Sequence, residues 1–306
     1  MRINSEYAYA HNVLRARTPA REQILSIFSQ LYHLAAYRLK EPKMQLGEGM
    51  VIVSVDIDVG NREVGLINRG KNDANVGRYI NEYSVGKIEE QALPFFIDFF
   101  NNFEIPVTFA FRGQFAEVDS SILGLLLRSH VKHDIGSHGY YHRDFRTLSQ
   151  SEAGRELNML SAAMKKFHVT PRSFVFPYNG IAHLDLLEKH GYKCYRGLGG
   201  ALKDGMWIKK EGQLYDIHPS FYLGQSISPV FLRWIIDISV ERRIPFHLWF
   251  HPWNFGGTEK SIQSSINNIF YPIFKYAKKK EKSGLLTFET MLSATKKVEK
   301  VFETAM

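Results

Sequence analysis

Eight short runs of mainly apolar residues constrain the fold of this chain more than any other feature, because they have the length and composition of buried strands. Most are continuously apolar rather than alternating, which is typical of parallel strands covered on both faces. Helical patterns lie between them, and this alternation indicates a (β/α) barrel or a doubly wound sheet. We expect an α/β fold, a distorted, TIM-like (β/α) barrel of seven or eight strands. The predicted strands are Met50–Asp56, Pro106–Phe111, Asp134–Ser137, Ser173–Pro177, Lys193–Arg196, Leu214–His218, Pro245–Phe250 and Leu285–Phe288.

The helical segments carry recognisable end signals. Ser149-Gln-Ser-Glu152 has the pattern of a capping box, and Ser228-Pro229 places a proline in a first helical turn. The stretch before Glu48 lies outside the alternation, so we predict an N-terminal helical extension over residues 1–47, packed on a barrel domain of residues 48–306. The predicted helices are Asn4–Lys40 (as one or two), Lys87–Phe103, Ser120–Val131, Ser149–His168, Ile181–His190, Ser228–Arg243 and Ser261–Lys280.

The composition, with 44% hydrophobic and 23% charged residues, is that of an ordinary globular protein. The N-terminus lacks the apolar stretch of a secretory signal, and no apolar run reaches about 18 residues, so we expect a cytoplasmic protein. The single cysteine, Cys194, excludes an intrachain disulfide and fits a reducing compartment. The net charge of +8 suits anionic partners, including peripheral contact with a membrane surface. No basic and aromatic stripe indicates nucleic acid, and no feature sets an oligomeric state.

Two short motifs carry the strongest chemical signal. Asp56 and Asp58 end the first predicted strand, and His138 and His142 follow the third. The carboxyl ends of parallel barrel strands converge on one face, so we expect the four side chains to meet there. One aspartate and two histidines are a complete ligand set for a hydrolytic metal ion, and the second aspartate is left as a base. These residues therefore predict metal-assisted hydrolysis.

Further polar residues follow other predicted strands. His251 ends an aromatic strand and is a candidate general acid, whereas His247 on the same strand is predicted to be structural. His183 is expected to orient the loop after the fourth strand, and His218 to line the pocket. The substrate contacts that we predict are Pro177, Asn179, His183, His218 and Trp253.

The motifs resemble those of the polysaccharide deacetylases, over about residues 48–290. Ser54-Val-Asp56-Ile-Asp58 is similar to the first family motif, with the D-x-D spacing of its peptidoglycan-deacetylase and allantoinase-like branch. His138-Gly-Tyr-Tyr-His142 is similar to the second, H-[ST]-x-x-H, and Val175-Phe-Pro177-Tyr178 to the third, R-x-P-[YW]. Trp249-Phe-His251 is similar to the last, L-x-H, with tryptophan in the leucine position.

The resemblance implies a role for each residue. Asp58, His138 and His142 would bind a divalent metal ion, in the first place Zn2+, with Co2+, Mn2+, Ni2+ and Fe2+ as alternatives. Asp56 would be the general base, and His251 would protonate the leaving amine. The backbone N–H of Tyr178 and the metal would hold the oxyanion.

Two departures from the family pattern stand out. Val175 replaces the arginine that steadies the base in the family, and we expect an arginine of the long loop Val59–Gly86 to substitute for it. That loop is also expected to shape the site. The fourth motif, an Asp-Trp pair that orients the catalytic histidine, has no clear match. The candidate arginines are Arg62, Arg69 and Arg78, and the poor matches to the fourth motif are Asp216, Asp237 and Trp234.

The function that the resemblance implies is removal of acetyl groups from an N-acetylated sugar. The substrate would be a cell-envelope polysaccharide or a precursor of it, such as a lipid- or nucleotide-linked sugar. One alternative is a cyclic amide or ureide hydrolase on the same metal centre, as in the allantoinase-like relatives. The other alternative is a weakly active homologue that binds glycan. This hypothesis rests on the absence of the third-motif arginine.

Overall fold

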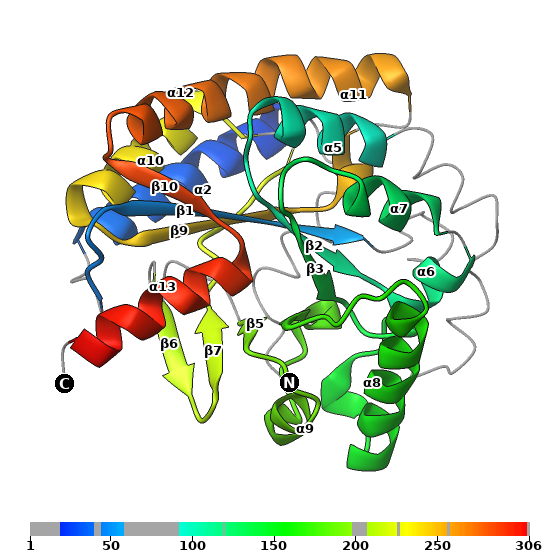
Figure 1. Ribbon diagram of the computed structural model, residues 1–306. Helices are drawn as coiled ribbons and strands as arrows, with labels where there is room; N and C mark the ends of the chain where they lie inside the picture. The colour runs from blue at the N-terminus through cyan, green and yellow to red at the C-terminus, as the bar shows by residue number, and fades with distance from the viewer. Residues whose placement is uncertain are drawn as a thin grey trace.

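The computed structural model describes residues 19–39, 44–57, 92–118, 120–197, 207–224, 227–255 and 258–304. One curled sheet wrapped by helices dominates these residues (Figure 1). Its strands are β1 (Gly49–Ile57), β2 (Thr108–Phe111), β3 (Asp134–Ser137), β4 (Ser173–Val175), β5 (Cys194–Arg196), β6 (Ile208–Glu211), β7 (Leu214–Ile217), β8 (Phe221–Tyr222), β9 (Pro245–Phe250) and β10 (Leu286–Glu289).

The strand order is β6-β7-β5-β4-β3-β2-β1-β9-β8, and β10 also pairs with β1. Every pairing is parallel except that of β6 with β7. Within the described residues no pairing joins the outer strands β6 and β8, so the sheet is a curled half-barrel. The predicted (β/α) barrel class is confirmed, but the sheet has ten strands rather than seven or eight. β6 has the polar edge sequence I-K-K-E and β8 has two residues, so neither gives an apolar run.

The central strand β1 shows how the sheet builds a polar inner face. All nine of its residues are buried, as expected for a strand covered on both sides. Val51, Val53, Val55 and Ile57 belong to the larger core on one face. The alternate residues on the other face change along the strand from apolar to polar, because Met50 and Ile52 are followed by Ser54 and Asp56. Polar side chains therefore gather only toward the carboxyl end of β1.

Helices cover the sheet, and their packing fixes which strand ends are accessible. The described helices are α2 (Pro19–Leu39), α5 (Leu93–Asn102), α6 (Gly113–Val118), α7 (Ser121–Leu127), α8 (Gln150–Lys165), α9 (Leu184–Lys189), α10 (Pro229–Arg242), α11 (Glu259–Ser265), α12 (Tyr271–Lys282) and α13 (Met291–Thr304). α10 packs between α2 and α12, and these three form one layer (Figure 1). None of the helices in the described ranges is long and apolar enough to cross a membrane.

The predicted N-terminal helix is seen as α2, which packs on the barrel helix α10. The side chain of Arg242 donates to the carbonyl oxygen of Tyr37 at 2.7 Å, and the hydroxyl of Tyr37 donates to the carbonyl of Ser220. The Gln30 side chain accepts from the N–H of Ser228 at 3.3 Å. The extent of a separate extension over residues 1–47 stays a prediction.

Three predicted helices differ from the structure for local reasons. The helix predicted from Ile181 begins at Leu184, because His183 adopts a left-handed backbone conformation (φ 55°) that a helix excludes. The helix predicted over Ser261–Lys280 is α11 and α12 joined by a π-helical turn at Ile266–Phe270. The helix predicted over Ser120–Val131 stops at Leu127. The sequence analysis did not predict α6 or α13.

The capping box of α8 gives a test of local stability. Ser149 accepts from the N–H of Glu152 at 3.3 Å, and Glu152 accepts from the N–H of Ser149 at 2.9 Å. We expect Ser149→Ala to lower the free energy of unfolding by about 1 kcal/mol in urea titrations, since the N–H of Glu152 loses the hydroxyl that accepts its hydrogen bond. The matched change Ser161→Ala, at an exposed position inside α8, should not lower it. Equal effects of the two substitutions would contradict the capping role.

Candidate functional site

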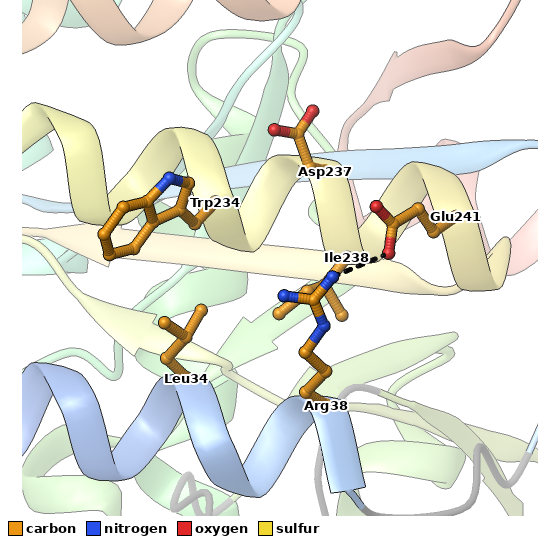
Figure 2. A pocket seen from close by; sticks show the side chains of 6 residues that line it. All are labelled: Leu34, Arg38, Trp234, Asp237, Ile238 and Glu241. Atoms are coloured by element: carbon orange, nitrogen blue, oxygen red, sulfur yellow. Dashed lines mark ion pairs between the residues drawn. The ribbon is translucent and has the colours of Figure 1, made fainter.

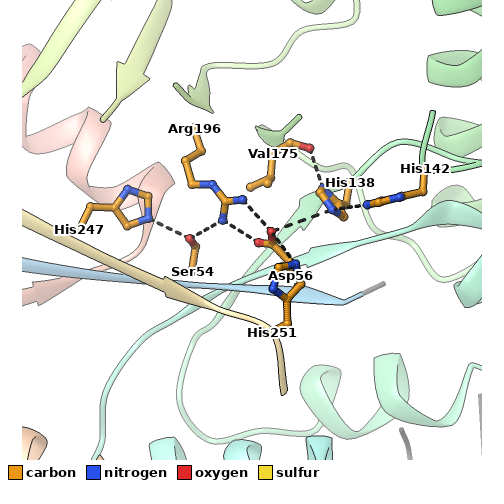
Figure 3. A network of polar contacts seen from close by, with 8 residues as sticks. All are labelled: Ser54, Asp56, His138, His142, Val175, Arg196, His247 and His251. Carbon is orange, nitrogen blue, oxygen red and sulfur yellow. Dashed lines mark hydrogen bonds and ion pairs between the residues drawn. The ribbon is translucent and has the colours of Figure 1, made fainter. Parts of the chain in front are cut away.

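A buried ion pair lies at the centre of the polar inner face (Figure 3). The guanidinium of Arg196, at the end of β5, donates two hydrogen bonds to the carboxylate of Asp56, at the end of β1. Both N–O distances are 2.6 Å, and the two side chains are 1% and 2% exposed. The pair is therefore bidentate and almost fully desolvated, a geometry that holds a carboxylate in one orientation.

Two further contacts hold the arginine. Its guanidinium carbon lies 4.2 Å from the ring centroid of Trp249, and it donates to the hydroxyl of Ser54 at 3.2 Å. Cation–π stacking of this kind gains strength when the cation is desolvated. Arg196 is thus fixed by a carboxylate, a hydroxyl and an aromatic face.

The charges around Asp56 decide its protonation state. Burial alone would raise the pKa of this carboxyl, but the Arg196 guanidinium, with His138 and His251, more than offsets burial and lowers the pKa to about 2. Asp56 is consequently ionised at neutral pH. A carboxylate in that state accepts protons but does not donate them.

His138 and His142 meet beside this carboxylate. Their Nε2 atoms lie 3.1 Å apart, and Nε2 of His138 is 4.0 Å from Oδ2 of Asp56. Nδ1 of His138 lies 2.8 Å from the carbonyl oxygen of Val175, so that nitrogen donates a hydrogen bond to the carbonyl. Burial, together with the neighbouring His138, keeps the pKa of His142 well below its usual value, so its ring is neutral. Histidine binds a metal ion through a neutral imidazole nitrogen, and the two Nε2 atoms here face each other.

His251 approaches the same carboxylate from β9. Its Nε2 lies 3.7 Å from Oδ2 of Asp56, and its side chain is 17% exposed, so it borders both the buried pair and the open side of the site. The half-buried rings of Tyr222 and Trp249 stand beside it, with centroids 6.0 Å and 5.6 Å from that of His251. The structure thus brings Asp56, His138, His142 and His251 together.

Left-handed backbone conformations concentrate around the histidines. His142 (φ 58°), Tyr178 (φ 57°) and Asn179 (φ 50°) all have positive φ, which is uncommon for residues with a side chain. Tyr178 and Asn179 belong to the short 3-10 helix Pro177–Asn179, and the Tyr178 ring lies 4.8 Å from that of His142. Strained backbone of this kind clusters at functional sites, where the surrounding structure enforces it.

Helix α8 supports the turn that carries the two histidines. The buried carboxylate of Glu156 accepts from the backbone N–H groups of Tyr140 and Tyr141, at 2.9 and 2.8 Å. Both N–H groups lie between His138 and His142 in the chain. A single carboxylate on a capped helix thereby fixes the shape of the H-x-x-x-H turn.

Two other predicted site residues, His183 and His218, have their own contacts, and further ones lie outside the described residues. The His183 ring contacts the carbonyl oxygen of Leu148 at 2.9 Å, which ties the start of α9 to the segment before α8. His218 stacks on Trp207, with ring centroids 4.7 Å apart, and its Nδ1 lies 3.9 Å from Asp216. Outside the described residues lie Asp58, the Val59–Gly86 loop with Arg62, Arg69 and Arg78, and the side chain of Trp253. Trp234 and Asp237, the poor matches to the fourth motif, lie on α10 in a groove beside α2 (Figure 2).

Arg196 is the residue that the sequence analysis missed. Val175, which stands where the third motif has arginine, pairs directly with Arg196 across β4 and β5. Residues paired in a parallel sheet point to the same face, so the guanidinium enters the site from the neighbouring strand. An arginine at the end of the buried strand predicted over Lys193–Arg196 was the available signal, since a buried cation needs an anionic partner.

The described residues contain no group of three or more His, Cys, Asp or Glu side chains arranged around a common point for a metal ion. Two of the three predicted ligands, His138 and His142, lie together, and Asp58 lies outside these residues. The donor chemistry of the described pair nevertheless fits a divalent cation, because the His142 ring is neutral and the two Nε2 atoms face each other.

Comparison with known proteins agrees with the geometry. The sequence profile described as polysaccharide deacetylase matches residues 83–195. No curated protein matches the chain. Among solved structures, a protein from Pseudomonas aeruginosa PAO1 named as a polysaccharide deacetylase has a TM-score of 0.59 at 12% identity, covering 87% of this chain and 97% of its own.

Two further structures have the same fold. One from Mycobacterium smegmatis, also named as a polysaccharide deacetylase, has a TM-score of 0.57 at 16% identity and covers 82% of this chain and 98% of its own. The allantoinase PuuE has a TM-score of 0.57 at 12% identity and covers 86% and 95%. At identities this low, the likeness shows a shared fold alone.

Below the ion pair, His247 gives a pH-dependent prediction. Its Nδ1 donates to the carbonyl of Ile217 at 3.2 Å, and its Nε2 accepts from Ser54 at 2.8 Å. Burial, and then the nearby Arg196, lowers the pKa of His247 to about 3, so protonation favours the unfolded chain. The stability that neutral His247 provides is complete above about pH 6.5 and is lost as the pH falls toward 3, by up to about 1.4 kcal/mol per pH unit.

We therefore expect His247→Gln to flatten the loss of unfolding free energy between pH 6 and pH 4, measured by urea titration at each pH. His168→Gln, at an exposed position, should lose unfolding free energy with falling pH as steeply as the wild type does. An unchanged slope in His247→Gln would show that His247 is not the residue protonated on unfolding.

Proposed function

We propose, from the polysaccharide deacetylase domain that this chain carries, that the protein is a metal-dependent hydrolase that removes acetyl groups from an N-acetylated sugar. The observation that carries the proposal is the meeting of His138 and His142 beside an ionised Asp56 that also faces His251. An amide-cleaving site needs a cation site, a base and an acid within reach of one bond. These four side chains offer all three.

His138 and His142 would hold the divalent ion, with Asp58 as the predicted third ligand. Zn2+ suits a set of two imidazoles and one carboxylate, and Co2+, Mn2+, Ni2+ and Fe2+ are alternatives with similar ligand preferences. The ion supplies Lewis acidity, which lowers the pKa of water and polarises an amide carbonyl. The hydrogen bond from His138 to the Val175 carbonyl would orient that ring toward the ion.

Asp56 would take the proton from the attacking water. Arg196 holds its carboxylate in one orientation and keeps it ionised, so the acceptor oxygen is ready before substrate binds. The water oxygen would then form the new bond to the acetyl carbon. Holding the carboxylate and the water in position before the reaction lowers the entropic part of the barrier.

His251 would protonate the leaving amine as the C–N bond breaks, which releases acetate and the free amino sugar. Its position between the Asp56 carboxylate and the open side of the site suits a group that must reach the substrate nitrogen. The backbone N–H of Tyr178, in the strained turn beside His142, is the proposed donor to the developing oxyanion. One such donor contributes about 3 kcal/mol to lowering the barrier.

We propose a cell-envelope glycan, or its lipid- or nucleotide-linked precursor, as the substrate class. The half-buried rings of Tyr222 and Trp249, with centroids 4.6 Å apart, provide an aromatic wall beside His251. Aromatic rings combine a large apolar face with a polar edge, which suits the mixed surface of a sugar. Pro177, Asn179, His183, His218 and Trp253 remain the predicted further contacts.

The central test combines a substrate panel with a base substitution. We expect the metal-loaded protein to release acetate from N-acetylated sugars and oligosaccharides but not to open allantoin or cyclic imides. Asp56→Asn should abolish acetate release, by 1,000-fold or more in kcat, because the base is lost while the two histidines remain. Metal content should be measured in both proteins and should stay the same.

Opening of allantoin without acetate release would instead establish the ureide hydrolase alternative. Tight binding of an N-acetylated oligosaccharide without turnover would establish the glycan-binding one. Full activity of Asp56→Asn would exclude Asp56 as the base.

Substitution of Arg196 tests how the base is positioned. We expect Arg196→Met to lower kcat for acetate release at least 100-fold and the free energy of unfolding by about 3–5 kcal/mol, because Asp56 is left buried without its partner. Arg196→Lys should fall between this variant and the wild type, since lysine keeps the charge but not the bidentate fork. Exposed Arg172→Met is the matched control and should retain kcat. A wild-type kcat in folded Arg196→Met would remove the positioning role.

A further inference from the structure

Exposed apolar side chains are concentrated on one helical layer. Of the large hydrophobic side chains that are exposed in the described part of the chain, eight lie on α2, α10 and α12, and four lie elsewhere. Phe28 is 66% exposed, Leu31 is 52% exposed and Trp234 is 48% exposed. The eight are Ile27, Phe28, Leu31, Tyr32 and Leu39 on α2, Val230 and Trp234 on α10, and Tyr271 on α12. Exposed apolar side chains gathered on one layer in this way mark an interaction surface.

A groove joins the two apolar helices (Figure 2). It has a volume of about 250 Å³ and runs between α2 and α10, with Leu34 on one side and Trp234 on the other. Arg38 crosses toward Glu241, with an N–O distance of 3.6 Å. Trp234 of α10 and Leu34 of α2 therefore line one groove on this layer.

Basic residues border this surface on α12. Lys275, Lys279 and Lys282 are exposed at four- and three-residue spacing, on the side of α12 opposite buried Ile273 and Phe274. Within the described ranges none of the three lysines has an acidic partner. Among the acids of the layer whose side chains the structure describes, Asp237 pairs with Lys280, Glu241 with Arg38, and Glu281 with Lys278.

We propose that this layer is a docking surface for an anionic lipid membrane, a role beyond the proposed hydrolase activity. The docking surface consists of the eight exposed hydrophobic side chains together with Lys275, Lys279 and Lys282. Apolar side chains enter the headgroup boundary while neighbouring lysines contact lipid phosphates, which is how amphipathic helices bind a bilayer without crossing it.

Charge favours a membrane over a second copy of the chain. A symmetric dimer through this layer would use the same surface twice and so bring together two rows of lysines that lack acidic partners among the described residues. An anionic bilayer neutralises the lysines and accepts the apolar side chains at the same time. The net charge of +8 acts in the same direction.

One end of the surface lies toward the open end of the site, whereas Lys282, just before β10, lies toward the amino ends of the strands. Val240, in the last turn of α10, contacts Gly49 at the amino end of β1, so Val230 and Trp234 lie toward the carboxyl ends of the strands. Gln30 of α2 contacts Ser228 at the start of α10, which places Phe28 and Leu31 at the same end. Docking would therefore hold the site that contains Asp56 and His251 close to the lipid surface.

The test is sedimentation of the full chain with vesicles of phosphatidylcholine alone or with about 30% phosphatidylglycerol. We expect binding to the anionic vesicles only, and release in 0.5 M salt, because salt screens the lysines. Phe28→Ser with Leu31→Ser should weaken binding at least tenfold, since the inserted apolar area is lost. Neutralising Lys275, Lys279 and Lys282 to Gln should weaken it about 100-fold.

Matched control variants distinguish binding through this surface from effects of net charge or of exposed apolar residues elsewhere. Leu125→Ser with Leu127→Ser, on α7, removes exposed apolar residues elsewhere, and the triple change of Lys132, Lys165 and Lys193 to Gln alters net charge equally. Both should bind as the wild type does, and circular dichroism should show every variant folded. Absence of binding to anionic vesicles, or equal binding by all variants, would overturn the proposal. A dimer by light scattering that Phe28→Ser with Leu31→Ser dissociates would assign the surface to a second copy instead.

Discussion

The bidentate pair of Arg196 and Asp56 is the interaction on which the rest of the site depends. Two opposite charges lie in the interior with almost no solvent contact, so each is tolerated only because the other is present. The same pair keeps Asp56 ionised and sets the position from which His138 and His251 are reached. Ser54 and Trp249 extend the constraint, since both hold the guanidinium. The chemistry of the inner face therefore depends on two buried charges that must neutralise each other.

The sheet brings these side chains together because side chains alternate between its two faces and because its strands pair in a fixed register. Ser54 and Asp56 share the inner face of β1, and Ser54 pairs with Trp249 on β9, which brings the hydroxyl and the ring to the same guanidinium. Parallel pairing aligns the carboxyl ends of distant segments, so residues far apart in the chain meet at one edge. A charged site at the ends of apolar strands is thus a consequence of the topology.

Local patterns predicted much of this arrangement, and non-local contacts account for what they missed. Asp134–Ser137 and Pro245–Phe250 are strands with the predicted bounds, and the capping box at Ser149 is formed. Nothing near Arg196 in the sequence names its partner, because Asp56 lies 140 positions away. The strained backbone before α9 was not predicted either. Tyr178, Asn179 and His183 have positive φ but are not glycines, so the sequence does not mark these positions.

The position of Arg196 changes how the departure at Val175 is interpreted. Val175 and Arg196 are directly opposed on neighbouring strands, so a guanidinium from either strand enters the same face at the same level of the sheet. A carboxylate responds to the position of a positive charge and not to the strand that supplies it. The alternative of a weakly active glycan-binding homologue was motivated by a missing arginine, and that motive disappears when the guanidinium contacts Asp56 from β5.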